Sequence, residues 1–383
     1  TWMQLPVMLC EQSLQHTIQT IRLKRYNLQT IRRFCAERAI DADLDEAVDG
    51  VQFFSTAAAL HARVGWWRHV RPLLRPFGIE ILEGEEEMRE HLRLRPGATL
   101  NAYGAVRLRH DFDTICAARF VIGAVREAAS AGAHVHVHTH TRVLRIEPAT
   151  AAGGECTIHT DRGAVRCKKV VVATNGYIGS LIPALADKIR PIRNHVLVTS
   201  PAPWLLKDGS RCGMGGQNGF AYWIQREDGR IVLGGFRERE PGCGVDQADD
   251  SKEAEDPQAR AAIRSFLWDH FDLRGAEPPV CIEQEWTGII GWSCDDMPWV
   301  GPLPGQPGIF VCAGYCGSGL SRAFACGVTV AEMICGEAQP TAFVAKFLPD
   351  WSRSWTADLE AGHAVSAGAR DAHKDQSISK GKA

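Results

Sequence analysis

The sequence lacks the signals of several common protein classes. Among its 383 residues, 43 lysines and arginines nearly balance 45 aspartates and glutamates, so no dominant charge favours nucleic acid or an anionic membrane as a partner. No apolar run approaches the roughly 18 residues that span a bilayer, and the first twenty residues lack the basic and apolar stretches of a secretion signal. We therefore expect a small molecule as the partner, with no nucleic acid and no membrane.

Paired cysteines and hydrolase motifs are missing as well. The 13 cysteines are scattered without a Cys-x-x-Cys pair, and several stand in apolar runs such as the one that ends at Cys312. Buried, reduced thiols of this kind predict a cytoplasmic protein. No His-Glu-x-x-His or Ser-His-Asp pattern is recognisable. Because the chain begins with Thr1 in place of methionine, we expect a fragment, a processed form or an incomplete gene product.

The N-terminal third of the sequence has the spacing of amphipathic helices. Apolar residues recur every three to four positions over 8–40, 56–77 and 113–131, and an acidic run at 83–87 starts a further short helix. In the first segment these apolar positions are Leu14, Ile18, Ile21, Leu28, Ile31 and Phe34.

Strand signals begin at residue 134. The alternating segment 134–140 predicts a strand, and three short alternating pieces at 143–147, 156–160 and 164–167 predict a meander of hairpins. Residues 170–176 form a continuous apolar run that turns abruptly polar, which is typical of a buried parallel strand ending at a site. This order of elements predicts an α/β fold.

Residues 190–290 differ in kind and predict a second, largely antiparallel domain. Strand-like segments joined by Gly, Pro and Asp clusters occur at 196–199, 219–225, 230–234 and 280–288. The buried-strand pattern returns at 308–314, and a helix is predicted over 320–334. The small, polar last twenty residues predict a disordered tail.

A glycine-rich turn joins that last strand to the last helix at residues 314–320, Gly-Tyr-Cys-Gly-Ser-Gly-Leu. Glycines in this place let the backbone approach a ligand and aim N–H groups at it. The start of a helix also stabilises the negative charge that a reduced flavin carries around N1 and the C2 carbonyl. A tight turn with no ligand is an equally good interpretation of the turn taken alone.

Four segments together resemble the D-amino-acid oxidase-like superfamily of FAD oxidoreductases, especially the branch of glycine, sarcosine and γ-glutamylputrescine oxidases. They are 132–147, 170–177, 220–236 and 285–336. The last segment is the most specific, because Trp286-Thr-Gly, Asp295-Asp-Met-Pro-Trp-Val-Gly301 and the glycine-rich turn arrive with the family's spacing.

The resemblance implies noncovalent FAD and an α/β fold, with a truncated FAD-binding Rossmann-like domain interleaved with an antiparallel-sheet substrate domain. The implied cofactor contacts are Val143 at the adenine end, Thr174, Asn175 and Gly176 at a strand end, and Gly314, Tyr315, Gly317, Ser318, Gly319 and Leu320 in the turn. The implied parts are a helical segment 1–50, substrate domain 51–107 and 184–290, FAD domain 108–183 and 291–345, and a tail 346–383.

The chain departs from the family pattern where the pyrophosphate of FAD is held. Family members open with a strand, a Gly-x-Gly-x-x-Gly turn and a helix, and no such pattern occurs here. The glycines at 213–216 and 234–235 do not replace it, because they lie in the antiparallel domain and open no helix. We expect weak FAD binding or none, and an exposed apolar edge or face on the parallel sheet.

The substrate and flavin contacts of the family are altered too. Ile290 stands where glycine oxidases have an arginine for the substrate carboxylate, and Ser321 stands where sarcosine oxidases have a lysine. Gly288 replaces the cysteine that attaches flavin covalently. Arg322 is a candidate replacement cation unless it points to solvent, and Ser318 replaces a frequent histidine and is expected to alter flavin tuning.

Three other residues are candidate substrate contacts alongside Arg322. Tyr222 and Gln225 lie on a strand that in the family faces the substrate pocket, and Trp292 precedes the flavin-facing loop, so an aromatic cage around an amine is one interpretation. Ordinary packing of sheet aromatics is the other. The four alternating histidines of 134–140 favour a solvated strand face over a metal site, because i, i+2 side chains rarely converge on one ion.

The resemblance implies an FAD-dependent enzyme that oxidises a C–N bond of an amine or amino acid, with oxygen as acceptor and peroxide as product. The protein's contribution is expected to be positioning, so no catalytic base is assigned. The alternatives are a dehydrogenase that uses another acceptor and an inactive relative that acts as a scaffold or binding protein. The amine and the oligomeric state are not identified by the sequence.

Overall fold

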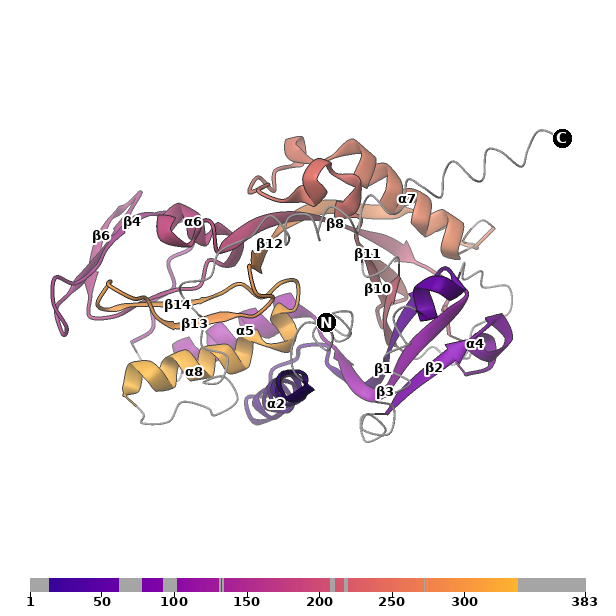
Figure 1. The fold of residues 1–383 in the computed structure, drawn as a ribbon, viewed down its shortest axis with the longest axis horizontal. Coiled ribbons are helices and arrows are strands. Elements are labelled where there is room, and N and C mark those ends of the chain that lie inside the picture. The colour runs from indigo at the N-terminus through magenta and orange to yellow at the C-terminus, as the bar shows by residue number, and fades with distance from the viewer. Residues whose placement is uncertain are drawn as a thin grey trace.

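Three β-sheets organise the computed structural model of the chain, which describes residues 14–61, 78–91, 102–130, 132, 134–206, 211–216, 220–271, 273 and 275–336. Figure 1 shows a small meander at one end, a short three-stranded sheet in the middle and a large sheet at the other end. The chain passes between these parts more than once, so each is assembled from segments that are distant in sequence.

The large sheet has eight strands in the order β12-β8-β11-β10-β9-β1-β3-β2. Their bounds are β1 Asp45–Phe54, β2 Ile79–Glu83, β3 Gly104–Thr114, β8 Ile189–Pro201, β9 Cys212–Gly216, β10 Ala221–Gln225, β11 Arg230–Gly235 and β12 Ile282–Ser293. All neighbouring strands are antiparallel except β1 and β9. The predicted antiparallel sheet is confirmed, and it also takes in strands from the N-terminal third that helical spacing did not reveal.

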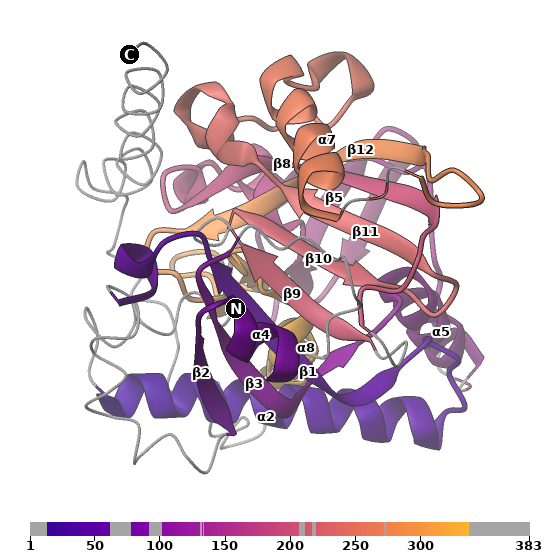
Figure 2. The same cartoon turned by 90° about the vertical axis from the view of Figure 1, so that its right-hand side faces the viewer.

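Helix α7 (Pro257–Phe271) covers one face of the large sheet (Figure 2). The rings of Phe266 and Phe271 on this helix lie 5.5 and 5.6 Å, centroid to centroid, from Trp223 of β10. Phe53 of β1 stacks on the same tryptophan at 5.7 Å. Because Trp223 points into this aromatic core, its strand neighbours point to the opposite face, which is left for other contacts.

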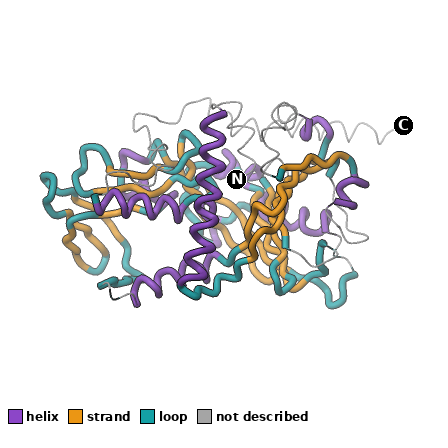
Figure 3. Tube along the Cα trace, turned by 90° about the horizontal axis from the view of Figure 1, so that it is seen from below, coloured by secondary structure: helices purple, strands orange, loops and turns teal. Residues whose placement is uncertain are grey.

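The three-stranded sheet has the order β13-β14-β7 and contains the parallel pair expected of an α/β fold. Its strands are β7 Val170–Val172, β13 Trp299–Pro302 and β14 Ile309–Ala313. Helix α8 (Ala323–Cys335) packs against it, and the long helix α2 (Leu14–Glu37) runs across the molecule beside α8 (Figures 1 and 3). Leu23 of α2, Phe310 of β14 and Val330 of α8 share one buried cluster.

The third sheet is the predicted meander, with β4 Val143–Glu147, β5 Cys156–Thr160 and β6 Gly163–Cys167 all antiparallel. Other α-helices are α4 Glu85–His91, α5 Ala117–Ser130 and α6 Ile178–Leu181. Short 3-10 helices are η2 Asn175–Tyr177, η3 Pro183–Leu185, η5 Arg237–Arg239, η6 Pro241–Gly244, η7 Lys252–Ala254 and η8 Gly319–Ser321. Within the described ranges, no helix combines the length and the apolar character needed to cross a bilayer.

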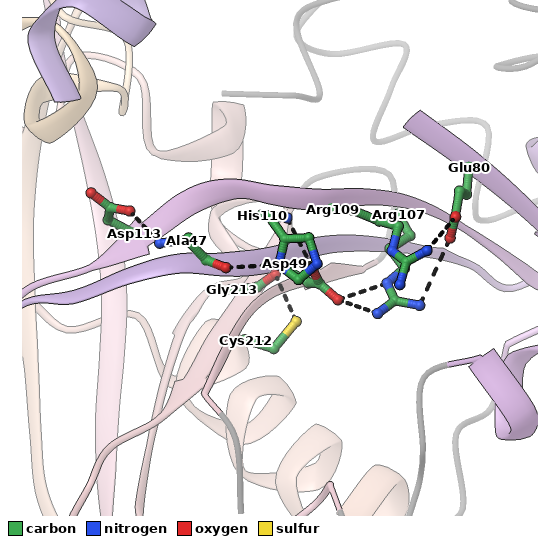
Figure 4. A network of polar contacts seen from close by, with 9 residues as sticks. All are labelled: Ala47, Asp49, Glu80, Arg107, Arg109, His110, Asp113, Cys212 and Gly213. Carbon is green, nitrogen blue, oxygen red and sulfur yellow. Dashed lines mark hydrogen bonds and ion pairs between the residues drawn. The ribbon is translucent and has the colours of Figure 1, made fainter. Parts of the chain in front are cut away.

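The register between β1 and β3 shifts twice between Asp45 and Gly50. Figure 4 shows side chains that bond to the backbone beside these shifts. Asp49 accepts hydrogen bonds from Nε of Arg107 at 2.7 Å and from the amide of His110 at 3.0 Å. Asp113 accepts one from the amide of Ala47 at 3.0 Å. These carboxylates replace ladder hydrogen bonds that a bulge removes, so the strands stay paired.

One strand prediction was wrong. Residues 134–138 have no regular structure and pair with no strand among the described residues. Histidine and valine alternate there in the sequence, as polar and apolar residues do in a strand. Val135 and Val137 are exposed there, as is Val171 in the edge strand β7. Alternation favours an extended backbone, but a strand exists only when a neighbour supplies its hydrogen bonds.

The helix predictions are partly confirmed. The helix predicted over 8–40 is α2, whose described part starts at Leu14, and the helix predicted over 113–131 starts later, at Ala117, because β3 occupies the preceding residues. Residues 62–77 and the predicted tail lie outside the described residues. The domain boundaries stay a prediction, and β3 and β12 run across those at 107/108 and 290/291.

A buried ionic cluster joins β8 to the segment that follows β11. The carboxylate of Glu240 accepts hydrogen bonds from Nη2 of Arg193 at 2.9 Å and from Nε2 of His195, and all three residues are buried. Burial alone would raise the pKa of Glu240, but the hydrogen bonds from His195 and Arg193 outweigh it and hold that pKa below the ordinary 4.5. The cluster therefore stabilises the fold in its ionised form.

Replacing Glu240 by alanine should destabilise the protein by about 3–5 kcal/mol, because the Arg193 cation is left buried without its carboxylate. Since the folded pKa of Glu240 is lowered, its contribution is complete above pH 4.5 and is lost as the pH falls through the folded value. Urea unfolding at several pH values should show a wild-type advantage that shrinks in acid. The exposed Glu283→Ala variant is the control, and an equal loss in both variants would contradict the assignment.

Candidate active site

Two predicted cofactor segments meet where parallel strands β7 and β14 end. The strands pair in register from Val170 with Ile309 to Val172 with Val311, so the residues after both strands leave the sheet at the same edge. These residues are 173–176 after β7 and the 314–320 turn after β14. The pairing of two strands that lie nearly 140 residues apart in sequence thus brings both segments to one edge of the sheet. A ligand that binds at this edge can contact both segments.

Asn175 connects the two segments directly. Its Oδ1 accepts a hydrogen bond from the amide of Gly314 at 3.0 Å, and its own φ is 49°. The next residue, Gly176, packs so closely on β12 that a Cβ there would lie 2.8 Å from Cγ2 of Ile289. The amide of Cys316 donates to the carbonyl of Gly291 on β12 at 2.9 Å. These contacts therefore fix the residues after β7 and the 314–320 turn against each other and against β12 of the large sheet.

The 314–320 turn has a backbone suited to close contact with a ligand. Gly314, Cys316 and Gly317 have φ values of 80°, 52° and 73°, a region that glycine tolerates best. The amide of Ser318 donates to the carbonyl of Tyr315 at 2.8 Å. No hydrogen bond from the amides of Gly317 and Gly319 is found within the described part of the chain. Neighbouring amides of this kind in a glycine-rich turn favour an electronegative ligand group.

Asn27 of α2 holds the far end of the turn, and sequence reasoning missed it. Its Nδ2 donates to the carbonyl of Leu320 at 2.9 Å, and its Oδ1 accepts from the amide of Ala325 at 3.0 Å. The second bond satisfies an N-terminal amide of α8, the function that a helix cap performs. Asn27 is 0% exposed, and the only signal in the sequence is an amide among apolar helix positions.

Ser318 carries a buried polar atom that suits a cofactor. The residue is 2% exposed, and its hydroxyl has no hydrogen-bond partner among the described residues. A buried hydroxyl without a partner is costly, so this atom fits a ligand heteroatom such as those of a flavin ring. The residues at the ring end of the predicted FAD site therefore fit the cofactor.

Tyr222 lies on the face of the large sheet opposite to the aromatic core. Its ring crosses Gly234 on β11, where a Cβ would come within 2.4 Å of the ring. Its phenol oxygen accepts a hydrogen bond from Nδ2 of Asn194 at 2.9 Å. Although 41% of Tyr222 is exposed, desolvation of the phenol raises its pKa to about 12 and the Asn194 bond opposes that shift. An ordinary tyrosine is already protonated at neutral pH, so the O–H remains a donor with or without the shift.

Gln225 does not face the same side as Tyr222, which corrects its expected place among the substrate contacts. The two are three residues apart on β10, so they point to opposite faces. Gln225 is buried, its Oε1 accepts from the amide of Leu205 at 2.9 Å, and its Nε2 donates to the carbonyls of Ala202 and Gly229. This side chain holds a loop in place.

The expected role of Arg322 is corrected as well. It is 0% exposed, and its Nη1 donates to the carbonyl of Asp296 at 3.0 Å, so it does not open to a substrate pocket. Burial lowers the pKa of Arg322, while the neighbouring Cys316 and Asp296 oppose the shift. Trp292 is held by the same aspartate, because its Nε1 donates to Oδ1 of Asp296 at 2.6 Å. Its substrate role stays a prediction.

The remaining predicted contacts are spread along the structure. Thr174 is exposed before η2, and its carbonyl accepts from the amide of Tyr177 at 3.0 Å. Val143 opens β4 in the separate meander, opposite Thr160. The histidines of 134–140 are exposed, and the described residues contain no group of three His, Cys, Asp or Glu that could hold a metal ion.

Next to β7 and α8, the described residues do not fit the pyrophosphate of FAD. A cavity of about 430 Å³ lies there, lined by Val171, Ala173, Cys312, Tyr315, Ala323, Gly327, Val330, Ala331 and Ile334. Its lining carries no charged side chain, and an apolar surface cannot replace the hydration of a pyrophosphate. β7 is the edge strand beside it, with Val171 42% exposed, in agreement with the predicted exposed apolar edge.

Comparisons with known proteins agree with this fold. The family model described as FAD dependent oxidoreductase matches residues 8–333. A probable oxidoreductase of Rhizobium meliloti is 29% identical over 224 residues, which are 57% of this chain and 46% of that protein. Glycine oxidase of Pseudomonas aeruginosa is 27% identical over 182 residues, 47% of this chain and 45% of that protein. The chain thus spans about half the length of the curated relatives it matches.

Among solved structures, glycine oxidase from Geobacillus kaustophilus superposes with a TM-score of 0.65. The alignment covers 85% of this chain and 80% of that one, with 17% identical residues. At such identity the likeness concerns the fold. It confirms the predicted α/β architecture with an interleaved antiparallel domain.

Replacing Asn27 by alanine should destabilise the protein by about 1–3 kcal/mol, because the Leu320 carbonyl and the Ala325 amide both lose their buried partner. Urea unfolding measures the change. The exposed Gln29→Ala variant on the same helix is the control and should alter stability by no more than about 0.5 kcal/mol. Similar losses in both variants would show that Asn27 does not cap α8.

Proposed function

The chain belongs to the FAD dependent oxidoreductase family, and we propose that it oxidises a C–N bond of an amine or amino acid, with oxygen as acceptor and hydrogen peroxide as product. The observation that carries the proposal is the edge formed by residues 173–176 and the 314–320 turn, fixed by the Asn175–Gly314 bond. This edge adjoins the sheet face that carries Tyr222, so a cofactor and a small substrate have adjacent surfaces.

The chain's own residues would hold the ring end of the cofactor through backbone groups. Thr174, Asn175 and Gly176 line one side, and the turn from Gly314 to Leu320 lines the other. When bound, FAD supplies the two-electron acceptor for the oxidation. The amides of the turn and the N-terminus of α8 place partial positive charge at this edge, which favours a ligand that gains negative charge.

Tyr222 and its neighbours would position the substrate. The neutral phenol offers an O–H to a substrate oxygen or nitrogen, and Asn194 fixes its direction. Trp286 lies in the same row across β12, β8, β11 and β10 and is 43% exposed, so it offers an apolar surface. The substrate C–H and N–H bonds lose two electrons and two protons to form an imine, which water hydrolyses, and oxygen accepts both to form peroxide.

Two alternatives remain for the test. A dehydrogenase would pass the electrons to an acceptor other than oxygen. A noncatalytic binding protein is favoured by the apolar cavity where a pyrophosphate would need polar partners. The cytoplasmic location also stays a prediction, supported by the absence of a disulfide among the cysteines of the described residues.

Purified protein mixed with FAD should give the absorbance bands of bound flavin and release peroxide with at least one member of a panel of amines and amino acids. Binding should be weak, because the described residues supply contacts for the ring end alone. Flavin that bleaches with substrate under anaerobic conditions but yields no peroxide in air would indicate a dehydrogenase. A spectrum identical to that of free FAD would contradict an enzymatic role for this chain.

Replacing Ser318 by alanine should have opposite effects on the protein with and without FAD. Without FAD the variant should gain about 1 kcal/mol of stability, because a buried hydroxyl without a partner among the described residues is removed. FAD affinity should fall about tenfold through the loss of one buried hydrogen bond. Urea unfolding and flavin fluorescence titration measure the two effects. The exposed Ser55→Ala variant should change neither, and a loss of stability in Ser318→Ala would refute the assignment.

A further inference from the structure

Two cysteines lie directly opposite each other in the meander of β4, β5 and β6, at one end of the molecule (Figure 1). Cys156 opens β5 and Cys167 closes β6, and the antiparallel register pairs them without a shift. Both are free thiols in the structure. Because directly paired residues of antiparallel strands point to the same face, the two thiols share one face of the meander.

The separation of this pair suits a disulfide. The Cβ atoms of directly opposed residues in antiparallel strands lie about 4.5–5.5 Å apart, whereas a disulfide needs about 3.5–4.5 Å, so an approach of about 1 Å is enough. Strand β6 is free to make this movement. Among the described strands it pairs with β5 alone, and its residues Gly163 to Arg166 are exposed.

The side chain of Cys156 is buried against the turn that precedes β14. It is 0% exposed, and its thiol donates to the carbonyl of Pro307 at 3.6 Å. Its Sγ fills space left by Gly308, where a Cβ would lie 2.6 Å away. The Pro307 carbonyl also accepts a hydrogen bond from the amide of Ala149 at 3.1 Å. Rotation of the Cys156 thiol toward Cys167 therefore leaves that carbonyl with a donor.

Cys167 is the accessible member of the pair. It is half-buried at the border of the apolar cluster that contains Cys156. Burial raises the pKa of the Cys167 thiol, and the neighbouring Cys156 and Glu155 add to the shift. Because the thiolate is the reactive form, Cys167 should react with an oxidant slowly at neutral pH.

From this arrangement we infer that Cys156 and Cys167 form a reversible disulfide when the protein meets hydrogen peroxide. The inference goes beyond the proposed function and does not depend on it, although an enzyme of that function releases the same oxidant. A pair of thiols that only fill space in the meander is the competing interpretation.

The oxidation takes two steps. The Cys167 thiolate attacks one oxygen of the peroxide, the O–O bond breaks, and the departing hydroxide takes up a proton to become water, which leaves a sulfenic acid on Cys167. The sulfur of Cys156 then attacks the sulfur of Cys167, the S–O bond breaks, and the hydroxide leaves with the Cys156 proton as a second water. Two thiols thus lose two electrons and two protons, and one peroxide is reduced to two waters.

Peptide mass mapping of peroxide-treated protein tests the inference. The treated protein is unfolded in iodoacetamide, which blocks every remaining thiol, and is then digested with trypsin. Because Arg162 and Arg166 lie between the two cysteines, they fall on separate tryptic peptides. These peptides should be found linked, with a mass lower by two hydrogen atoms than their reduced sum, and dithiothreitol should release both.

Two variants distinguish the roles of the cysteines. In Cys156→Ser the sulfenic acid on Cys167 has no thiol to resolve it, so dimedone should label Cys167 in place of disulfide formation. In Cys167→Ser the buried Cys156 should remain a thiol after the same treatment. Cys281→Ser, at an exposed cysteine outside the meander, is the control and should form the linked pair as the wild type does. Circular dichroism establishes that each variant is folded.

Recovery of both meander cysteines as alkylated thiols, under conditions that oxidise the exposed Cys281, would overturn the inference. Disulfides that join Cys156 or Cys167 to other cysteines, in place of each other, would overturn it as well. Since the peroxide is added, the outcome is distinct from that of the oxidase assay. A linked pair in a protein without oxidase activity would retain the inference and reject the proposed function, and oxidase activity without a linked pair would do the reverse.

Discussion

The parallel pairing of β7 with β14 is the constraint on which the rest of the site depends. Each strand is short, and neither carries a functional side chain, but their register puts the 314–320 turn beside residues 173–176. Two asparagines then fix the turn from outside: Asn175 at its start and Asn27 at its end. Because both side-chain amides bond to backbone groups, they hold the two ends of the turn in place.

The sequence predicted the parts of this arrangement that are local. Continuous apolar runs that end in glycine or polar residues marked β7 and β14, and the glycines marked the turn. Asn27 was not predicted, because an amide on a helix ordinarily faces solvent, and only the packing of α2 against α8 buries it. Gln225 and Arg322 were misplaced for a related reason: polarity suggests a ligand contact, whereas these buried groups satisfy backbone carbonyls.

Strand pairing explains why the strand predicted at the start of segment 134–140 does not form among the described residues. The alternation there encodes an extended segment, but β7 pairs with β14 alone among the described strands and offers its other edge to none of them. Val135, Val137 and Val171 are exposed as a result, and the cavity beside β7 and α8 is apolar. A nonlocal partner strand cannot be inferred from periodicity, and for this reason the strand prediction was wrong.

Glycines shape the substrate side of the site as much as side chains do. A Cβ on Gly234 would collide with the ring of Tyr222, so the tyrosine can lie across β11 and reach Asn194 only because that position is glycine. Gly288 on β12 pairs directly with Asn194 on β8, and no atom of the described residues lies within 4 Å of the place that a Cβ on Gly288 would take. The two glycines therefore leave room on either side of Asn194, whose amide bonds to Tyr222.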